Sequence, residues 1–188
     1  MEIVKGSKGS REFKYLDDEL EHPLILDYQI IEYQGKNEDK EVVTKQVIVF
    51  DINDQQHEDS RNYCKQSRAF RYYSALNKTD EGDDLDKLPK IFLGDLSKYT
   101  PEQRAFIFLH EIGHLEHPEH KGGTENRNVE HEKQADDYAL TYRTSSRKNI
   151  SLAQPALDFF KEMEQTGEIK DRIKNIEDKF IKRKKTAI

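Results

Sequence analysis

Residues 100–115 read TPEQRAFIFLHEIGHL, and this stretch predicts the central helix of the second half of the chain. Thr100 supplies a hydroxyl that can cap a helix, Pro101 suits the first helical position, and Gln103 stands three residues after the cap. Apolar side chains then recur as far as Leu115. We therefore expect a capped helix from Thr100 to about Leu115.

Inside this helix, residues 110–114 spell H-E-I-G-H, an H-E-x-x-H pattern. Residues four apart share a face of a helix, so His110 and His114 can present their imidazoles to one point, with Glu111 beside them. Imidazole nitrogens are ligands that zinc prefers, and an adjacent carboxylate can reach a water on the metal without binding the metal. Without a metal, packing these polar groups together would be costly. The pattern predicts one zinc ion per chain.

A zinc site needs a third protein ligand, and the first option is Glu132 in the segment E-K-Q-A-D on the next predicted helix. Asp136 follows on the same face and can accept a hydrogen bond from the far nitrogen of a liganding histidine. Small Ala135 between them would let the two helices approach closely. We favour Glu132 as the third ligand.

The second option is His120, because the motif continues as L-E-H-P-E-H, with the ligand spacing of the extended H-E-x-x-H-x-x-G-x-x-H pattern. That pattern needs glycine at the turn after the helix, whereas this chain has His117 followed by Pro118. No convincing Met-turn follows, because Met163 falls in a helical stripe. If Glu132 is the ligand, His117, His120 and His131 are expected at the surface or at the rim of the site.

The first half of the chain carries strand patterns. Residues 24–33 and 41–51 are rich in β-branched and aromatic side chains and flank the turn-like GKNEDK, which predicts an antiparallel hairpin. Residues 58–76 lack Gly and Pro and predict a helix on that sheet. Residues 89–94 form a short apolar run whose leading proline predicts an edge strand.

Three more helices are expected after the zinc motif. The first spans residues 129–143, the second follows a capping-box candidate formed by Ser151 and Gln154, and the third ends near residue 180. The positions expected to face the core are Ala135, Tyr138, Ala139 and Tyr142, then Leu152, Ala156, Phe160 and Met163, then Ile169, Ile173, Ile176 and Phe180.

Composition narrows the classes of function. The 188 residues include 31 Lys plus Arg and 37 Asp plus Glu, a formal net charge of −6 that disfavours nucleic acid as a partner. No stretch approaches the ~20 apolar residues of a membrane span, and the N-terminus lacks a signal-peptide core. A lone Cys64 excludes an intrachain disulfide and fits the cytoplasm. We expect a soluble protein with a solvated basic tail, IKRKK.

The length suits a single α+β domain over residues 1–188. We expect residues 1–13 to be flexible, residues 14–99 to form a part of strands and helix, and residues 100–188 to form the helical zinc-site part. A small antiparallel or mixed sheet would pack against the active-site helix and the C-terminal helices.

The motifs HEIGH and EKQAD together resemble the gluzincin group of zinc peptidases, in the shared form H-E-x-G-H…E-x-x-A-D. This form is found in CAAX-processing membrane peptidases and in the small ImmA/IrrE-type peptidases of phages, mobile elements and bacterial stress responses. Because the sequence has no membrane-span pattern, the chain is most similar to the soluble ImmA/IrrE-type peptidases. The resemblance implies a zincin-like fold.

The resemblance also implies a function, that of a soluble zinc endopeptidase. His110, His114 and Glu132 would bind Zn²⁺, and Glu111 would be the general base for attack of a zinc-bound water on a peptide bond. The partner would be a protein or peptide substrate, with a transcriptional regulator such as a repressor as one candidate. Related enzymes hold an extended substrate against an edge strand, for which residues 91–93 are the candidate here.

Two other functions stay open at this point. One is a catalytically silent zinc-binding module with a regulatory or interaction role, and the other is a metzincin-like peptidase that uses His120 as its third ligand. Tyr138, Tyr142 or a histidine could stabilise the oxyanion, and the spacing does not choose among them.

Overall fold

The structure is a computed structural model in which the chain divides into two compact units, Met1–Leu96 and Ser97–Ile188. The expected α+β class is confirmed, because the first unit contains a mixed sheet and the second contains α-helices. The expectation of a single domain stays a prediction. The structure describes residues 4–13, 24–37, 39–58, 60–62, 88–117, 128–142 and 152–181.

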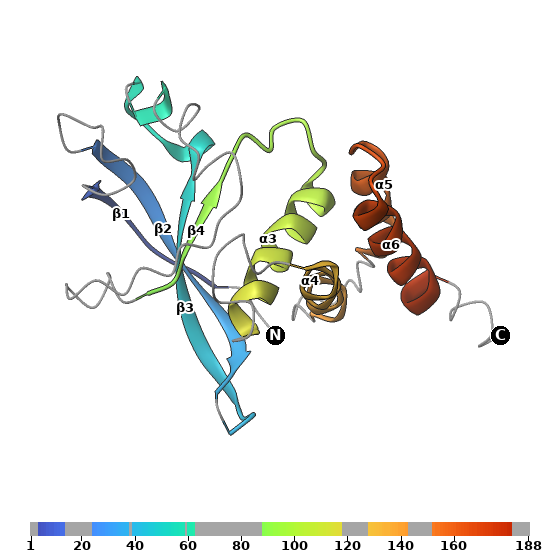
Figure 1. Ribbon diagram of the computed structural model, residues 1–188. Coiled ribbons are helices and arrows are strands. Elements are labelled where there is room, and N and C mark those ends of the chain that lie inside the picture. The colour runs from blue at the N-terminus through green and yellow to red at the C-terminus, as the bar shows by residue number, and fades with distance from the viewer. Residues whose placement is uncertain are drawn as a thin grey trace. The chain divides into compact units, whose positions relative to one another are not determined.

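The strands of the first unit form one sheet in the order β1-β2-β3-β4 (Figure 1). β1 pairs antiparallel with β2, β2 pairs antiparallel with β3, and β3 pairs parallel with β4. Their bounds are Val4–Phe13 for β1, Leu24–Lys36 for β2, Val42–Asp51 for β3 and Lys90–Leu93 for β4. The predicted hairpin and the edge position of the strand near residue 90 are therefore confirmed.

The turn between β2 and β3 is held by Asn37. Its backbone carbonyl accepts from the Lys40 N–H at 3.0 Å, and its side-chain oxygen accepts from the Glu41 N–H at 2.9 Å. Lys40 adopts a positive φ of 64°, which lets the chain reverse direction. Strand β2 extends to Lys36, beyond its predicted end at residue 33, whereas β3 begins at Val42, one residue later than predicted.

The core of the sheet unit is apolar. Phe50 on β3 stacks on Phe92 of the neighbouring β4 with ring centroids 5.0 Å apart. Leu26, Ile48 and Ile52 complete a buried cluster around these two rings. The short 3-10 turn η1 (Ile52–Asp54) ends β3 by placing Ile52 in this cluster. Burial of apolar area stabilises this cluster.

The N-terminal strand differs from the expectation. Residues 4–13 form β1, which lies along β2 from Val4 opposite Glu32 to Phe13 opposite Leu24, whereas the sequence favoured a flexible segment. The pairing satisfies the backbone groups that β2 would otherwise expose at a sheet edge. The predicted helix over residues 58–76 lies mostly outside the described residues, with one helical hydrogen bond from Arg61 N–H to the His57 carbonyl.

The second unit is built from α-helices, and α3, α4 and α6 begin at the polar cap residues Thr100, Asn128 and Thr166. Helix α3 contacts α4 and α5, and α6 contacts α4 and α5 (Figure 1). A π-helical turn, η4, continues α6 at its end. The bounds are Pro101–Glu116 for α3, Val129–Thr141 for α4, Ala153–Lys161 for α5, Gly167–Ile176 for α6 and Glu177–Ile181 for η4.

Helix α3 begins as the sequence predicts. The Thr100 hydroxyl accepts from the Gln103 N–H at 3.2 Å, and the Gln103 side chain accepts from the Thr100 N–H at 2.9 Å. Pro101 occupies the first turn. This reciprocal cap satisfies two backbone donors at once and fixes where the helix starts. The register of His110 and His114 on the helix follows from it.

Aromatic side chains join α3 to α5. The Phe106 ring of α3 meets the Phe160 ring of α5 edge-on at 5.8 Å, and Phe160 is fully buried. Tyr99 and Phe159 extend the cluster, with ring centroids 5.3 Å apart. This cluster lies next to His110, whose ring is 6.2 Å from Phe106. One side of the histidine pair is thereby apolar.

Two details of α5 depart from the prediction. Its cap residue is Leu152 without a side-chain hydrogen bond, Gln154 bonds to Asp158 instead, and the expected cap Ser151 lies outside the described residues. Met163 does not continue the buried stripe but is 40% exposed. The Gln165 amide donates to the Phe160 and Met163 carbonyls, each at 2.9 Å, so the helix ends before Met163.

Candidate metal centre

Three predicted ligand residues meet at one point. His110 and His114 come from α3 and Glu132 from the first turn of α4, and their donor atoms all lie within 4.8 Å of one another. The two Nε2 atoms are 3.1 Å apart. The Glu132 carboxylate lies 3.3 Å from His110 Nε2 and 3.5 Å from His114 Nε2. This His-His-Glu group could hold a metal ion.

The spacing of these atoms can be compared with a tetrahedral zinc site. Ligand atoms about 2.0–2.1 Å from a central ion lie about 3.3–3.4 Å from one another at tetrahedral angles. The two Nε2 atoms, 3.1 Å apart, are close to that value, whereas the 3.3 and 3.5 Å contacts of Glu132 are made by its two different oxygens. One atom from each of the three residues lies within 4.8 Å of the others. Two nitrogens and one oxygen are also a common donor set for zinc. The residues present therefore fit the metal that the sequence predicts.

The close crossing of α3 and α4 brings Glu132 to the histidines. Gly113 allows this close crossing because it has no side chain. A Cβ at this position would lie 2.8 Å from the Ala135 Cα and 2.9 Å from the Ala135 carbonyl oxygen. Ala135 is fully buried on the opposing helix, as expected from its small side chain. The Cβ of Tyr138 would also be close to a Cβ added at Gly113, at 3.1 Å. Gly113 is therefore part of the geometry of the site.

Asp136 lies one helical turn after Glu132 and contacts His110. The His110 Nδ1 and Asp136 Oδ1 atoms are 2.9 Å apart, and Asp136 is fully buried. Because an ionised carboxylate only accepts, Nδ1 is the donor. This hydrogen bond directs Nε2 of His110 toward Glu132 and His114. The sequence-based assignment of Asp136 as the partner of a histidine agrees with this contact.

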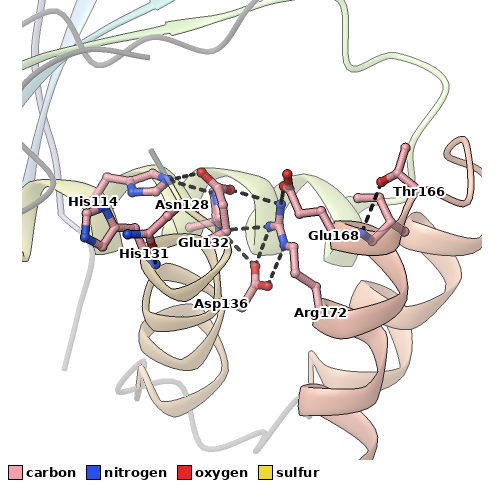
Figure 2. A network of polar contacts seen from close by, with 10 residues as sticks. His114, Asn128, His131, Glu132, Asp136, Thr166, Glu168 and Arg172 are labelled. Atoms are coloured by element: carbon pink, nitrogen blue, oxygen red, sulfur yellow. Dashed lines mark hydrogen bonds and ion pairs between the residues drawn. The ribbon is translucent and has the colours of Figure 1, made fainter. Parts of the chain in front are cut away.

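Sequence reasoning missed Arg172 of α6, which is 7% exposed. Its guanidinium donates from Nε to Asp136 Oδ2 at 2.8 Å and from Nη2 to Asp136 Oδ1 at 2.7 Å. The remaining Nη1 donates to Glu132 Oε2 at 2.9 Å. Figure 2 shows this side chain reaching from α6 to both carboxylates of α4. The sequence could have indicated that Arg172 is buried, because it lies between Ile169 and Ile176 on the apolar face of the last helix.

The buried charges shift one another's ionisation. Burial lowers the pKa of His110, but hydrogen bonds to Asp136 and Glu132 outweigh burial and raise this pKa to about 9. Burial raises the pKa of Glu132 and of Asp136, but the contacts to His110 and Arg172 hold both pKa values below their usual range. Both carboxylates are thus ionised at neutral pH. In the metal-free protein, a protonated His110 supplies positive charge next to the Glu132 and Asp136 carboxylates, as a bound metal cation would.

The other predicted residues are placed as follows. Glu111 is 3% exposed on α3 directly after His110. Burial raises the pKa of Tyr138 above its usual value, so its phenol stays protonated at neutral pH. His117 follows α3 and His131 lies in the first turn of α4, both half-buried. Among the residues singled out from the sequence, Cys64, His120 and the basic tail after residue 181 lie outside the described part of the chain.

No protein-family model, no curated protein and no solved structure matches the chain. Across the part of the chain that the structure describes, every helix is too short or too polar to cross a lipid bilayer.

Proposed function

We propose that the chain is a zinc-dependent endopeptidase. His110, His114 and Glu132 hold the zinc ion, and Glu111 is the general base. The observation that carries this proposal is the His-His-Glu group, whose donor atoms lie within 4.8 Å of one another and offer the two nitrogens and one oxygen that zinc accepts. The resemblance of HEIGH and EKQAD to the gluzincin peptidases supports the same assignment.

Zinc held by His110, His114 and Glu132 would supply Lewis acidity, which would polarise a peptide carbonyl and lower the pKa of a water so that its deprotonated form can attack. Glu111 then takes the proton of the attacking water and passes it to the leaving amine. Asp136 keeps the His110 imidazole in the tautomer that presents Nε2 to the site. The apolar side formed by Phe106 lowers the local dielectric and strengthens these electrostatic contacts.

The proposed substrate is a protein or peptide, with a transcriptional regulator such as a repressor as the first candidate to try. This choice rests on the resemblance to the ImmA/IrrE-type peptidases, as does the proposed location in the cytoplasm. The lone Cys64 fits that compartment.

The testing experiment is metal analysis of purified wild type beside Glu132→Ala and His120→Ala, with folding checked by circular dichroism. We expect about one zinc per chain in the wild type and in His120→Ala, and loss of zinc in Glu132→Ala. Loss at His120→Ala alone would replace this site by the metzincin-like alternative. Wild-type protein without metal would refute the proposal.

A second experiment addresses catalysis. Glu111→Gln keeps the shape of the side chain but cannot accept the proton, so zinc should be retained while peptide cleavage falls by at least about 10²-fold. Cleavage that survives this substitution would show that Glu111 is not the base.

A zinc module without turnover is the second candidate, and one observation favours it. His110, His114 and Glu132 are only 6–8% exposed, which restricts the access of a protein substrate to a metal held there. In that case, zinc removal should unfold the helical unit, whereas a catalytic site should lose its metal and remain folded.

A further inference from the structure

The guanidinium of Arg172 joins the predicted third ligand to the residue that orients the first. Arg172 donates to both oxygens of Asp136 and, with its remaining terminal nitrogen, to Glu132 Oε2 (Figure 2). Asp136 in turn contacts His110 Nδ1. The two ligand residues on different helices are thus linked through one planar group from a third helix.

The position of this guanidinium is itself fixed. Its fork geometry matches the Asp136 carboxylate bidentately, which sets the plane of the group. The Phe160 ring lies against that plane, with Arg172 Cζ 4.5 Å from the ring centroid. Glu168 adds only a longer contact of 3.7 Å from an exposed carboxylate. A donor held this rigidly can orient the group that it contacts.

We propose that Arg172 is a positioning residue of the metal centre. By donating to Glu132 Oε2, it restrains rotation of the Glu132 carboxylate and keeps Oε1 facing His114, at 3.5 Å from Nε2. Glu132 therefore meets a metal ion in one orientation. This inference rests on the metal-binding part of the proposed function and needs no peptide hydrolysis.

A simpler role for Arg172 would be to dock α6 on α4. Other residues of α6 and of the η4 turn that continues it also contact α4, however. Asn175 donates to Asp137 Oδ1 at 3.0 Å, and Lys179 pairs with the other oxygen of Asp137. These contacts hold α6 against α4 without reaching any of the three ligand residues. Asn175→Ala is therefore a matched control that weakens docking and leaves the carboxylate network in place.

The test is Arg172→Lys in the full chain. Lysine keeps the positive charge, so the electrostatic repulsion of a metal cation changes little, but it lacks the planar fork. Zn²⁺ affinity is measured by competition with a chromophoric chelator, and ligand geometry by the visible spectrum of the Co²⁺-loaded protein. We expect a 10–100-fold loss of Zn²⁺ affinity and an altered Co²⁺ spectrum, with Asn175→Ala close to wild type in both.

Two results would overturn the inference. One is a folded Arg172→Lys with wild-type affinity and spectrum, and the other is an equal loss in Asn175→Ala, which would reduce Arg172 to a docking contact. If Arg172→Lys does not fold, Arg172→Gln replaces it and the Co²⁺ spectrum decides, because loss of a charge alone changes affinity but not ligand geometry. A wild type that binds Zn²⁺ but cleaves no peptide refutes the peptidase alone, whereas one that binds no Zn²⁺ refutes both.

Discussion

The two units of this chain fill their interiors in different ways. In the sheet unit, Phe50 and Phe92 stack within a cluster of aliphatic side chains, and the buried polar side chains Gln55 and Lys90 donate to backbone carbonyls. In the helical unit, the space between α3, α4 and α6 contains His110, Asp136 and Arg172, all buried. An apolar core follows from burial alone, whereas ionised groups pay a large desolvation penalty when they leave water.

The difference between the two interiors distinguishes residues that stabilise the fold from residues that form a functional site. A buried ion pair is often no more stable than apolar side chains of the same volume, so stability does not explain why a chain retains one. The retained charges in the helical unit converge on the His-His-Glu group. The contrast between the units therefore supports a functional role for the charged interior, and it can be tested by substitution.

The largest effect is expected from breaking the charge network at one point. Arg172→Met leaves Asp136 and Glu132 buried without their guanidinium partner, and we expect a loss of about 3–5 kcal/mol in the free energy of unfolding of the metal-free protein. Urea denaturation followed by circular dichroism measures it. In the sheet unit, Phe92→Ala should cost a similar 3–5 kcal/mol or so through the cavity that it creates.

The control is the triple variant Glu132→Leu, Asp136→Leu, Arg172→Met, which replaces the network by apolar side chains. We expect its unfolding free energy to return to the wild-type value or to exceed it, while zinc binding is lost. A triple variant as unstable as Arg172→Met would show that the charges are required for folding, and the contrast between the units would disappear.

An intermediate effect is expected at the helix crossing. Gly113→Ala places a methyl group against the Ala135 backbone, so α3 and α4 must separate, at a cost of about 1–3 kcal/mol and with weaker zinc binding. Gly167→Ala, at the first position of α6, meets no atom within 4 Å and should instead stabilise by about 0.4–1 kcal/mol. Thermal melts and zinc titrations of the two variants compare them directly, and equal behaviour would argue against the close crossing.

The smallest effect is expected at the start of α3. Thr100→Ala removes the hydroxyl that accepts from the Gln103 N–H and should cost about 1 kcal/mol, because the first turn frays without its cap. Zinc affinity should change little, since His110 lies more than two turns from the cap. Thr100→Ser keeps a hydroxyl and should recover most of the stability, and failure to do so would argue against the capping role.

Elements with strong local signals were predictable from sequence. Thr100, Pro101 and Gln103 define the start of α3, and the β-branched residues of β2 and β3 define their hairpin. Strand β1 was not predictable, because its sequence VKGSKGSREF is rich in Gly, Ser and charge and has little intrinsic strand preference. Its conformation depends on the open edge of β2, which is a tertiary effect.

The candidate site divides in the same manner. His110, Glu111 and His114 follow from one motif on one helix, and Glu132 with Asp136 follows from a second motif. Arg172 carries no such motif, because an arginine on an amphipathic helix is usually solvated and only the structure places it between two carboxylates. The general expectation that charged side chains lie at the surface is therefore wrong for Arg172.

The contact between Gly113 and Ala135 also says how distant relatives of this chain could be recognised. A side chain larger than hydrogen at position 113 would meet the backbone of the opposing helix, so the glycine is as much a part of the signature as the ligands. A pattern of H-E-x-G-H, then E-x-x-A-D, then an arginine on the apolar face of a later helix combines ligand chemistry with packing. Such a pattern could identify chains that share this arrangement after overall sequence similarity has been lost.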